Sequence, residues 1–427
     1  MLDIKRIRED PDPFRKALAR RGMGDAVDRL LDADERRRSL TARVEELRAE
    51  QNRASKAIGA ASGDEKQRLI DEVAKVSADL KELEPQLATA DDELNALLAE
   101  IPNLPHESAP DGLVEEDAVE VKRNHDEPPA FDFEPRDHAE LGELLGMLDT
   151  ERGARTSGSR FVYLLGDLVF AQFALMRHAL DIVVEHGFVP TIPPVLVREE
   201  AMYGTGFLPT DAVNIYVTRD DDLYLVGTSE VPLAAFHLGE IVEETDLPLH
   251  YAGYSTCFRR EAGSYGKDLG GMFRVHQFDK VEMFVFCTPE TSWDEHERIL
   301  AVEEEIIGNL EIPYRVVNIA AGDLGGSAAK KYDIEGWLPG QARYRELTSC
   351  SNTTDYQARR MQTRVRRGDG SVEVLHTLNG TATAIGRTLI AILENHQRAD
   401  GSVELPEKLH PYLPERARVL TPRVAAG

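Results

Sequence analysis

Residues 40–97 carry a repeating pattern of apolar residues that a compact globular fold cannot accommodate. The apolar residues recur at alternating steps of four and three, in two runs separated by the stretch AASGDE. Such heptad spacing is typical of long helices that pack along a narrow seam, and Gln51 occupies one seam position. The seam positions are Leu40, Val44, Leu47, Ala54 and Ile58 in the first run, and Leu69, Val73, Val76, Leu80, Leu83, Leu87, Ala90, Leu94 and Leu97 in the second.

The two predicted helices can fold back on each other as an antiparallel hairpin. Ser62, with Glu65 three residues later, has the form of a capping box that opens the second helix. Helices of about 35 to 40 residues would make the hairpin roughly 50 to 60 Å long. From the pattern alone the hairpin is either a dimerisation coil or a recognition arm. The segment IPNLPHESAPDG, with three prolines, then ends the helix and forms a linker.

The composition indicates an acidic protein with room for one large domain and a smaller one. The chain has 427 residues, 42% of them hydrophobic, and a formal net charge of -26. This charge argues against general coating of nucleic acid, but it leaves room for a local basic surface. The N-terminal stretch is too charged for a secretory signal, and no apolar run has transmembrane length. Three widely spaced cysteines form neither a disulfide framework nor a zinc site, so we expect reduced thiols, a cytoplasmic location and no membrane association.

Beyond the linker the sequence has an α+β pattern. Residues 161–187 are apolar enough to predict a buried helix that ends at Gly187, and the proline-rich stretch FVPTIPPVLV predicts an edge or interface strand. Several strand-like segments follow with few helices between them, which favours a largely antiparallel sheet over a doubly wound parallel one. Neither GxxxxGK[ST] nor GxGxxG occurs in the required context, so a nucleotide would have to be held in another way.

One predicted hairpin has an unusual connection. The stretch FRREAGSYGKDLGGMFRVHQF, residues 258–278, predicts two strands joined by a long loop rich in glycine and charge. A purely structural hairpin prefers a short turn. The long loop therefore suggests a segment that closes over a ligand.

Five charged residues interrupt segments that are otherwise apolar or small. A buried arginine is costly unless it meets an anion, and clustered carboxylates need a cation. Each residue alone could belong to an internal ion pair. Five of them on separate strands of one sheet instead indicate a site for a polyphosphate with Mg²⁺ and a second, zwitterionic ligand. The five are Arg259, Arg387, Glu230, Glu282 and Glu346.

Three segments resemble the sequence motifs of class II aminoacyl-tRNA synthetases: motif 1 at about 161–197, motif 2 at about 254–284 and motif 3 at about 376–396. The stretches TSEVPLAAFH, HQFDKVEMF, ELTSCSN and NGTATAIGRTLIAILEN, with the N-terminal hairpin, are similar to bacterial seryl-tRNA synthetases along essentially the whole chain. The resemblance implies an α+β fold, a class II antiparallel β-sheet flanked by helices with an N-terminal antiparallel coiled-coil arm. Residues 1–110 would form a tRNA-binding domain, with the hairpin at about 28–100, and 111–427 the catalytic domain.

The resemblance also implies an activity. ATP and L-serine would form seryl-adenylate, and the seryl group would then move to the 3' end of tRNA-Ser, with tRNA-Sec as a further candidate acceptor, in a homodimer. Two rivals are an amino acid:carrier-protein ligase on the same catalytic fold and a catalytically inactive paralogue. The first would lack the arm, and the second would be expected to lose the phosphate-binding arginines.

Site residues follow from the same resemblance. Arg259 would bridge the α-phosphate and the serine carboxylate, Arg387 would reach the γ-phosphate side, and Phe278 would stack on adenine. Glu346 and Ser349 would hold Mg²⁺. The full ATP set is Arg259, Arg260, Glu261, Val275, Phe278, Glu346, Leu347, Thr348, Ser349 and Arg387. The serine set is Thr228, Ser229, Glu230, Arg259, Glu282, Asn379 and Thr381, with Glu230 at the ammonium group and Glu282 and Thr381 at the hydroxyl.

The sequence departs from the family pattern at three positions. Arg260, Thr348 and Thr381 stand where serine is usual. The role of the Arg260 side chain stays open. Thr381 keeps a hydroxyl and adds a methyl group to the serine pocket. No zinc site is inferred, because His and Cys residues lack metal-ligand spacing.

Basic residues gather on the first helix of the hairpin. On so acidic a protein they indicate a surface for RNA phosphates, although solvated faces of a coiled coil would have similar charges. The resemblance favours contact with the long variable arm of the tRNA. The predicted tRNA-binding residues are Arg36, Arg37, Arg43, Arg48, Arg53 and Lys56.

Overall fold

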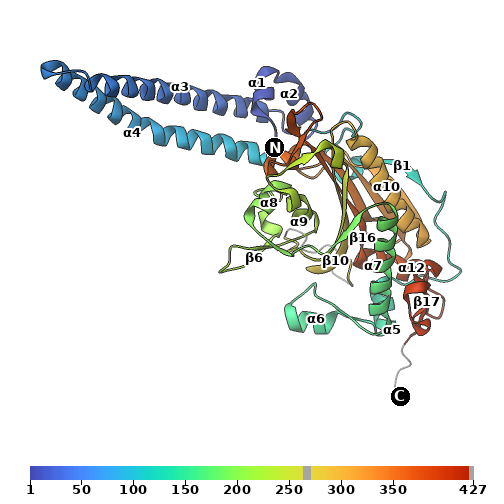
Figure 1. Cartoon of the computed structure of the whole chain (residues 1–427). Coiled ribbons are helices and arrows are strands. Elements are labelled where there is room, and N and C mark those ends of the chain that lie inside the picture. Colours follow the sequence, from blue (N-terminus) through green and yellow to red (C-terminus); the bar gives the residue numbers. More distant parts are fainter. Residues whose placement is uncertain (263–270, 423–427) are drawn as a thin grey trace. The chain divides into compact units, whose positions relative to one another are not determined.

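The computed structural model describes residues 1–262 and 271–422, and the chain divides into two compact units after Leu104 (Figure 1). The first unit is helical. Two short helices pack against the base of two long ones, where Ile7, Leu18, Leu30 and Leu94 are buried. The four helices are α1 (Ile4–Glu9), α2 (Asp12–Ala19), α3 (Ala26–Ile58) and α4 (Gly63–Glu100).

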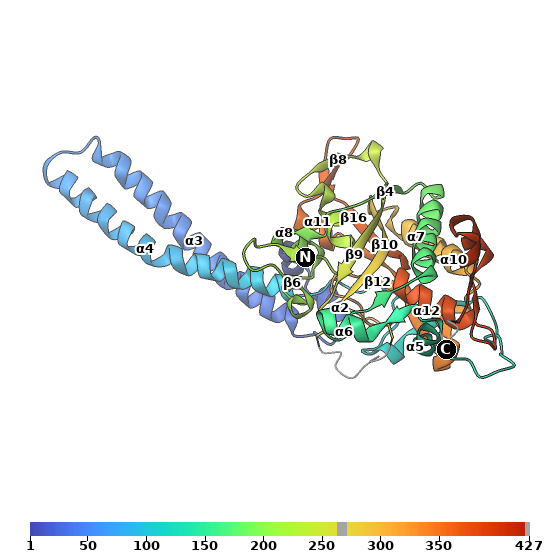
Figure 2. The ribbon, with the colours of Figure 1, turned by 90° about the horizontal axis from the view of Figure 1, so that it is seen from below.

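Helices α3 and α4 run side by side as an antiparallel hairpin (Figures 1 and 2). Val44 and Leu47 pack against Val76 and Leu80, as the heptad pattern predicts. With 33 and 38 residues, the helices are about 50 and 57 Å long. The coiled coil therefore forms within one chain. Ser62 is the N-cap of α4, but the capping-box prediction is wrong, because its side chain makes no capping hydrogen bond.

The second unit is built on a sheet that has eight strands in the described part of the chain. All neighbouring strands are antiparallel except β4 and β9, which are parallel, so the prediction of a largely antiparallel sheet is confirmed. In spatial order the strands are β1 (Val119–Arg123), β11 (Tyr314–Asn318), β12 (Lys330–Leu338), β13 (Arg343–Thr354), β16 (His376–Ala384), β10 (Gln277–Cys287), β9 (Leu249–Phe258) and β4 (Val189–Thr191).

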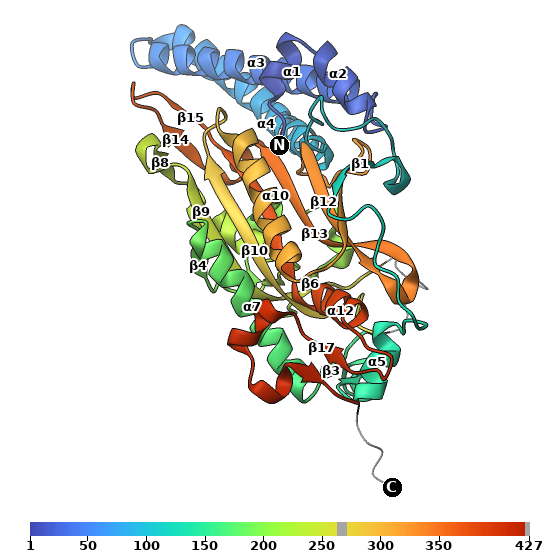
Figure 3. The ribbon, with the colours of Figure 1, turned by 90° about the vertical axis from the view of Figure 1, so that its right-hand side faces the viewer.

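Three helices pack on one face of this sheet (Figure 3). They are α7 (Asp167–Glu185), α10 (Ser292–Asn309) and α12 (Ile385–Asn395). Side chains alternate along β10, so Val281 and Met283 join the core under these helices, whereas Phe284 joins a separate cluster with Leu233. The face away from the three helices is therefore left to receive a ligand.

Shorter elements complete the second unit. No helix in the described ranges is long and apolar enough to cross a membrane. The remaining helices are α5 (His138–Leu145), α6 (Thr150–Ser157), α8 (Glu199–Thr205), α9 (Glu230–Ala234) and α11 (Tyr356–Met361). The remaining strands are β2 (Leu148–Asp149), β3 (Tyr163–Leu164), β5 (Leu196–Val197), β6 (Tyr216–Val217), β7 (Tyr224–Leu225), β8 (Ile241–Glu243), β14 (Arg364–Arg366), β15 (Val372–Val374), β17 (Val403–Glu404) and β18 (Val419–Leu420).

The helix predicted for residues 161–187 is shorter than expected. Strand β3 occupies Tyr163–Leu164, and Gly166, at φ 62°, precedes the first helical residue, Asp167. Only glycine adopts this left-handed backbone at little cost, so the helix cannot extend further back. The helix ends at Glu185, and the proline-marked stretch that follows contains the edge strand β4, as predicted.

The prediction that five charged residues interrupt strands is correct for two of them. Glu282 lies on β10 and Glu346 on β13. Arg259 instead follows the last residue of β9, Glu230 begins α9, and Arg387 lies in the first turn of α12. Charged side chains at the ends of elements reach a ligand without occupying a position in the apolar pattern of a strand. The sequence pattern did not separate these cases.

Candidate active site

A pocket on the open face of the sheet gathers the residues predicted for ATP. Its lining comes from the end of β9, from β10 and β13, and from the start of α12. Thr381 also lines it, whereas Arg260 is absent from the lining formed by the described residues. The ATP-set residues that line it are Arg259, Glu261, Val275, Phe278, Glu346, Leu347, Thr348, Ser349 and Arg387.

Arg259 directly follows the last residue of β9, and two contacts fix its side chain. Its Nε donates to the carbonyl oxygen of Gly227 at 3.1 Å, and its guanidinium carbon lies 5.3 Å from the centre of the Phe278 ring. The cation and the aromatic ring are thus held together at one side of the pocket.

Arg387 and Glu346 form the charged pair at the other side. Burial alone would raise the pKa of Glu346, but the charges of Arg387 and then Lys331 outweigh it and lower the pKa to about 2. This carboxylate is therefore ionised throughout the physiological range. An ionised oxygen donor and a fixed cation are what a magnesium-bound polyphosphate requires.

The segment that returns to β10 contributes residues that the sequence analysis missed. The Phe273 ring contacts the guanidinium groups of both Arg345 and Arg387, with carbon-to-ring-centre distances of 3.8 and 4.8 Å. Arg274 pairs with Glu261 at 2.8 Å. The signal in the sequence was the alternation of aromatic and basic residues in MFRVHQF.

The carboxylates predicted for serine lie beside this pocket. The hydroxyl of Thr381 donates to Glu282 at 3.3 Å across the β10–β16 pair, and Asn379 Nδ2 donates to both Glu282 and Glu230 at 3.4 Å. Lys280, which the sequence analysis also missed, forms an ion pair with Glu282 and lines the ATP pocket. The serine and ATP sets are therefore continuous.

Gln357 holds the carboxylate of Glu230 in place. The amide nitrogen of Gln357 donates to the Glu230 carboxylate at 2.7 Å, and its amide oxygen accepts from the hydroxyls of Thr377 at 2.9 Å and Thr353 at 3.4 Å. Because an ionised carboxylate only accepts hydrogen bonds, the amide nitrogen of Gln357 faces Glu230 and the amide oxygen faces the two hydroxyls. Burial, followed by the charge of Glu282, raises the pKa of Glu230 to about 7.

The other two serine-set residues contact the backbone at the start of α9. The hydroxyl of Thr228 accepts the backbone N–H of Glu230 at 3.1 Å. Ser229 is fully buried, and its hydroxyl donates to the carbonyl oxygen of Gly253 on β9 at 3.0 Å. These contacts fix the turn that presents Glu230.

The residues predicted to bind tRNA all lie on α3, but most of them pair with acids. Arg36 pairs with Glu93 at 3.4 Å, and Arg48 with Glu84 at 2.8 Å. Arg37 and Arg43 pair with Asp34 at 3.0 Å and Glu46 at 2.5 Å, respectively. Within the described chain, Arg53 and Lys56 are exposed and have no ion pair. The free positive charge therefore lies toward the turn of the hairpin.

Glu346 and Ser349 supply oxygen donors of the kind that Mg²⁺ prefers. Among the described residues, no group of three or more His, Cys, Asp or Glu side chains is arranged to hold a metal ion. Glu346 and Ser349 therefore fit an ion that takes its remaining ligands from phosphate oxygens and water.

The family model described as "Seryl-tRNA synthetase N-terminal domain" matches residues 1–105, and "tRNA synthetase class II core domain (G, H, P, S and T)" matches residues 215–396. The chain is 52% identical to the "Serine--tRNA ligase" of Streptomyces coelicolor over 425 residues, which covers 99% of both chains. The chain belongs to the seryl-tRNA synthetase family.

Other members of the family match this chain over nearly its whole length. A "Serine--tRNA ligase" of Thermobifida fusca is 51% identical over 97% of both chains. The crystal structure of the Pyrococcus horikoshii seryl-tRNA synthetase complexed with ATP superposes with a TM-score of 0.91 at 42% identity, covering 99% of this chain and 100% of that one. The cytoplasmic Serine-tRNA ligase of Naegleria fowleri in complex with AMP gives a TM-score of 0.86 at 35% identity, with 99% of each chain covered. The class II fold predicted from the sequence is thereby confirmed.

Proposed function

We propose that this chain activates L-serine with ATP and transfers the seryl group to tRNA-Ser. The observation that carries the proposal is that the pocket assigned to ATP is continuous with the carboxylates assigned to serine, since Lys280 and Thr381 line the pocket and contact Glu282. Arg259, Glu346 and Arg387 also line the pocket, and Glu230 and Glu282 lie beside it. Cations suited to a polyphosphate thus stand next to carboxylates suited to an amino acid that carries an ammonium and a hydroxyl group.

In the first step, an oxygen of the serine carboxylate attacks the α-phosphorus of ATP, and the bond to the bridging oxygen of pyrophosphate breaks. Arg259 would contact both reacting groups and bring them into line. Arg387 would neutralise charge on the leaving pyrophosphate. Such a step depends mainly on positioning and electrostatic stabilisation.

In the second step, a ribose hydroxyl at the 3' end of the tRNA attacks the seryl carbonyl carbon and AMP leaves. Glu230 would keep hold of the serine ammonium during both steps, and Glu282 with Thr381 would keep hold of its hydroxyl. Phe278 and Glu261 would hold the adenine. Magnesium, held by Glu346, Ser349 and the phosphates, would add positive charge at the reacting phosphates.

We also propose a homodimer in the cytoplasm. Helix α7, strand β4 and the residue after β4 belong to the motif 1 region and expose large apolar side chains: Phe170, Phe173, Val189 and Ile192 are between 39% and 85% exposed. Apolar surface of this kind favours burial against a second copy. Light scattering should then give twice the 47.6 kDa mass of the chain.

Aminoacylation tests the proposal. The purified protein should attach labelled serine to tRNA-Ser in a reaction that requires ATP and Mg²⁺, and tRNA-Sec can be tested as a second acceptor. Transfer of serine to a carrier protein, with none to tRNA, would favour the carrier-protein ligase. The absence of any transfer by the folded protein would favour the inactive paralogue.

A further inference from the structure

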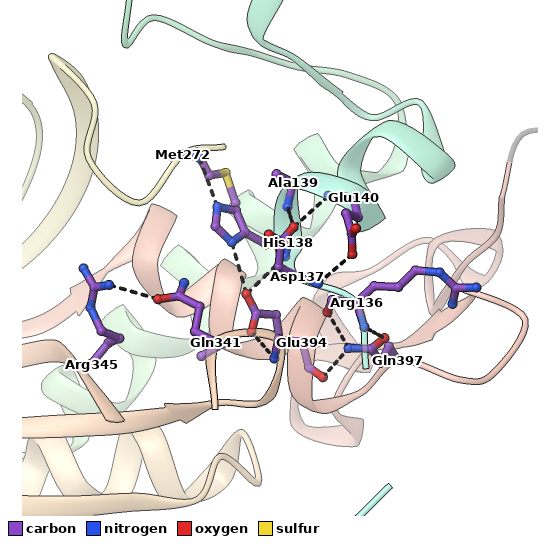
Figure 4. A network of polar contacts seen from close by, with 12 residues as sticks. Arg136, Asp137, His138, Ala139, Glu140, Met272, Gln341, Arg345, Glu394 and Gln397 are labelled. Carbon is purple, nitrogen blue, oxygen red and sulfur yellow. Dashed lines mark hydrogen bonds and ion pairs between the residues drawn. The ribbon is translucent and has the colours of Figure 1, made fainter. Parts of the chain in front are cut away.

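A buried network joins three segments that are distant in the sequence (Figure 4). At its centre is Glu394, a fully buried carboxylate near the end of α12. It accepts hydrogen bonds from the backbone N–H of His138 at 3.1 Å, from Nδ1 of the same residue at 3.1 Å, and from the backbone N–H of Gly340 at 3.0 Å. The carboxylate thus ties α12 to the start of α5 and to the β12–β13 turn.

The other side of the His138 ring reaches the segment that precedes β10. The backbone N–H of Met272 donates to Nε2 at 3.3 Å. Because Nε2 accepts a hydrogen bond, the ring proton lies on Nδ1, where it faces Glu394. The neighbouring Gly271 has φ 66°, and a Cβ atom there would lie 2.1 Å from Nε2, so only glycine allows the backbone to approach the ring this closely.

The anchored segment forms a wall of the ATP pocket. Met272 and Phe273 both line the pocket, and the Phe273 ring contacts the guanidinium groups of Arg345 and Arg387. Arg345 in turn donates to the side chain of Gln341 at 2.9 Å, in the same turn that Glu394 holds. Arg345 and the backbone next to Phe273 are therefore both tied to this network.

We propose that His138 is a positioning residue for ATP binding. Its ring fixes the backbone at Met272 and so holds Phe273 against Arg387, the residue assigned to the γ-phosphate side. The inference rests on the proposed function, because it takes this pocket to be the ATP site. His138 itself does not line the pocket formed by the described residues, so it acts through Phe273.

Two substitutions separate the two contacts of the ring. In His138→Asn the amide can still donate to Glu394, as Nδ1 does, but it is too short to accept from Met272. In His138→Gln the amide oxygen can reach Met272. Loss of one hydrogen bond should raise KM for ATP in pyrophosphate exchange by about 3- to 10-fold in His138→Asn, with KM for serine nearly unchanged. His138→Gln should restore most of the ATP affinity.

Phe273 supplies a second test. If His138 acts through Phe273, Phe273→Leu should raise KM for ATP, and adding His138→Asn should raise it little further. His410→Asn is the control, since its Nε2 contacts only the carbonyl oxygen of Leu405 among the described residues, at 2.9 Å. It should leave KM for ATP unchanged.

Several outcomes would overturn the inference. One is an unchanged KM for ATP in folded His138→Asn, and another is an equal rise in both KM values. If His138→Asn does not fold, an ATP affinity of His138→Gln equal to that of Phe273→Leu, by calorimetry, would also overturn it. A wild-type protein that shows no serine-dependent exchange would instead refute the proposed function.

Discussion

Nη1 of Arg387 lies 3.2 Å from the carboxylate of Glu346 and also donates to its backbone carbonyl oxygen at 3.1 Å. Both side chains are assigned to the magnesium-bound triphosphate, one to the phosphate and the other to the metal. In the free protein they satisfy each other, so neither charge is left unpaired in a partly buried site. Binding of the nucleotide would exchange this internal pair for two complementary contacts.

Removal of either phosphate arginine should nearly abolish adenylate formation. Loss of a preorganised charge that stabilises the transition state typically costs about 10²–10³ in rate. We expect Arg259→Ala and Arg387→Ala to lose serine-dependent pyrophosphate exchange by that factor at saturating ATP, with their melting temperatures little changed. Arg398→Ala, which removes an exposed ion pair with Glu404, is the matched control. Near wild-type exchange by either site variant would remove that residue from its assigned role.

The serine pocket should discriminate unevenly among small amino acids. With alanine, a buried acceptor such as Glu282 would lose the hydrogen bond from the substrate hydroxyl, and sites built around a substrate hydroxyl reject analogues that lack it by roughly 10⁴ or more. Threonine keeps the hydroxyl, and an extra methyl group is excluded by only about 10- to 200-fold. Values of kcat/KM in exchange should therefore fall in the order serine, threonine, alanine. A higher value for alanine than for threonine would contradict the assignment of Glu282.

Serine binding should depend on the protonation of Glu230. The ammonium group of serine needs an ionised carboxylate, and the pKa of Glu230 in the free protein is raised to about 7. As the pH falls below about 7, a growing fraction of the protein carries a proton there, and KM for serine should rise by up to about tenfold per pH unit. Above that pH, KM should level off. Glu230→Gln should have a high KM with no such dependence; the same profile in the variant would show that another group titrates.

Gln357 should influence the binding of serine rather than the binding of ATP. Its hydrogen bond lowers the pKa of Glu230 and orients the carboxylate. In Gln357→Leu the inflection in KM for serine should move to higher pH, and KM near neutral pH should rise by about tenfold or more, since hydrogen bonds to charged groups are the stronger ones. KM for ATP is the internal control. A parallel rise in both KM values would indicate general damage to the fold.

Removal of the outer part of the hairpin should affect the two half-reactions differently. Residues 42–87 can be replaced by a short Gly–Ser turn, because the small core formed by Leu30, Leu94 and Leu98 at the base of the hairpin would remain. Exchange should persist, whereas charging of tRNA-Ser should fall by orders of magnitude, mainly through KM.

A double variant, Arg53→Ala with Lys56→Ala, offers a finer test of the same surface. It should weaken charging and reduce its salt dependence, since each phosphate contact contributes to the salt slope. Normal charging by the shortened protein would show that the arm has another role.

The sequence predicted the features that depend on local pattern. The seam around Val44 and Leu80 follows from heptad spacing, and the gathering of Arg259, Glu346 and Arg387 was expected because buried charges need partners. Glu230 was wrongly placed on a strand, because the apolar residues around it fit a strand as well as a short helix.

The network of His138 and Glu394 could not be predicted. Its members come from residues 138, 272, 340 and 394, and only the folded sheet brings them together. Neither His138 nor Glu394 stands in a local pattern that indicates a partner so distant in the chain. The residues at 263–270, where the sequence analysis expected a loop that closes over a ligand, lie outside the described part of the structure.

Pyrophosphate exchange across a panel of the standard amino acids tests the central claim most directly, because it measures amino-acid activation without tRNA. The purified protein should exchange labelled pyrophosphate into ATP with serine, more weakly with threonine, and hardly at all with the others, and only when Mg²⁺ is present. Stronger exchange with another amino acid, or none with serine by a folded protein, would contradict the account.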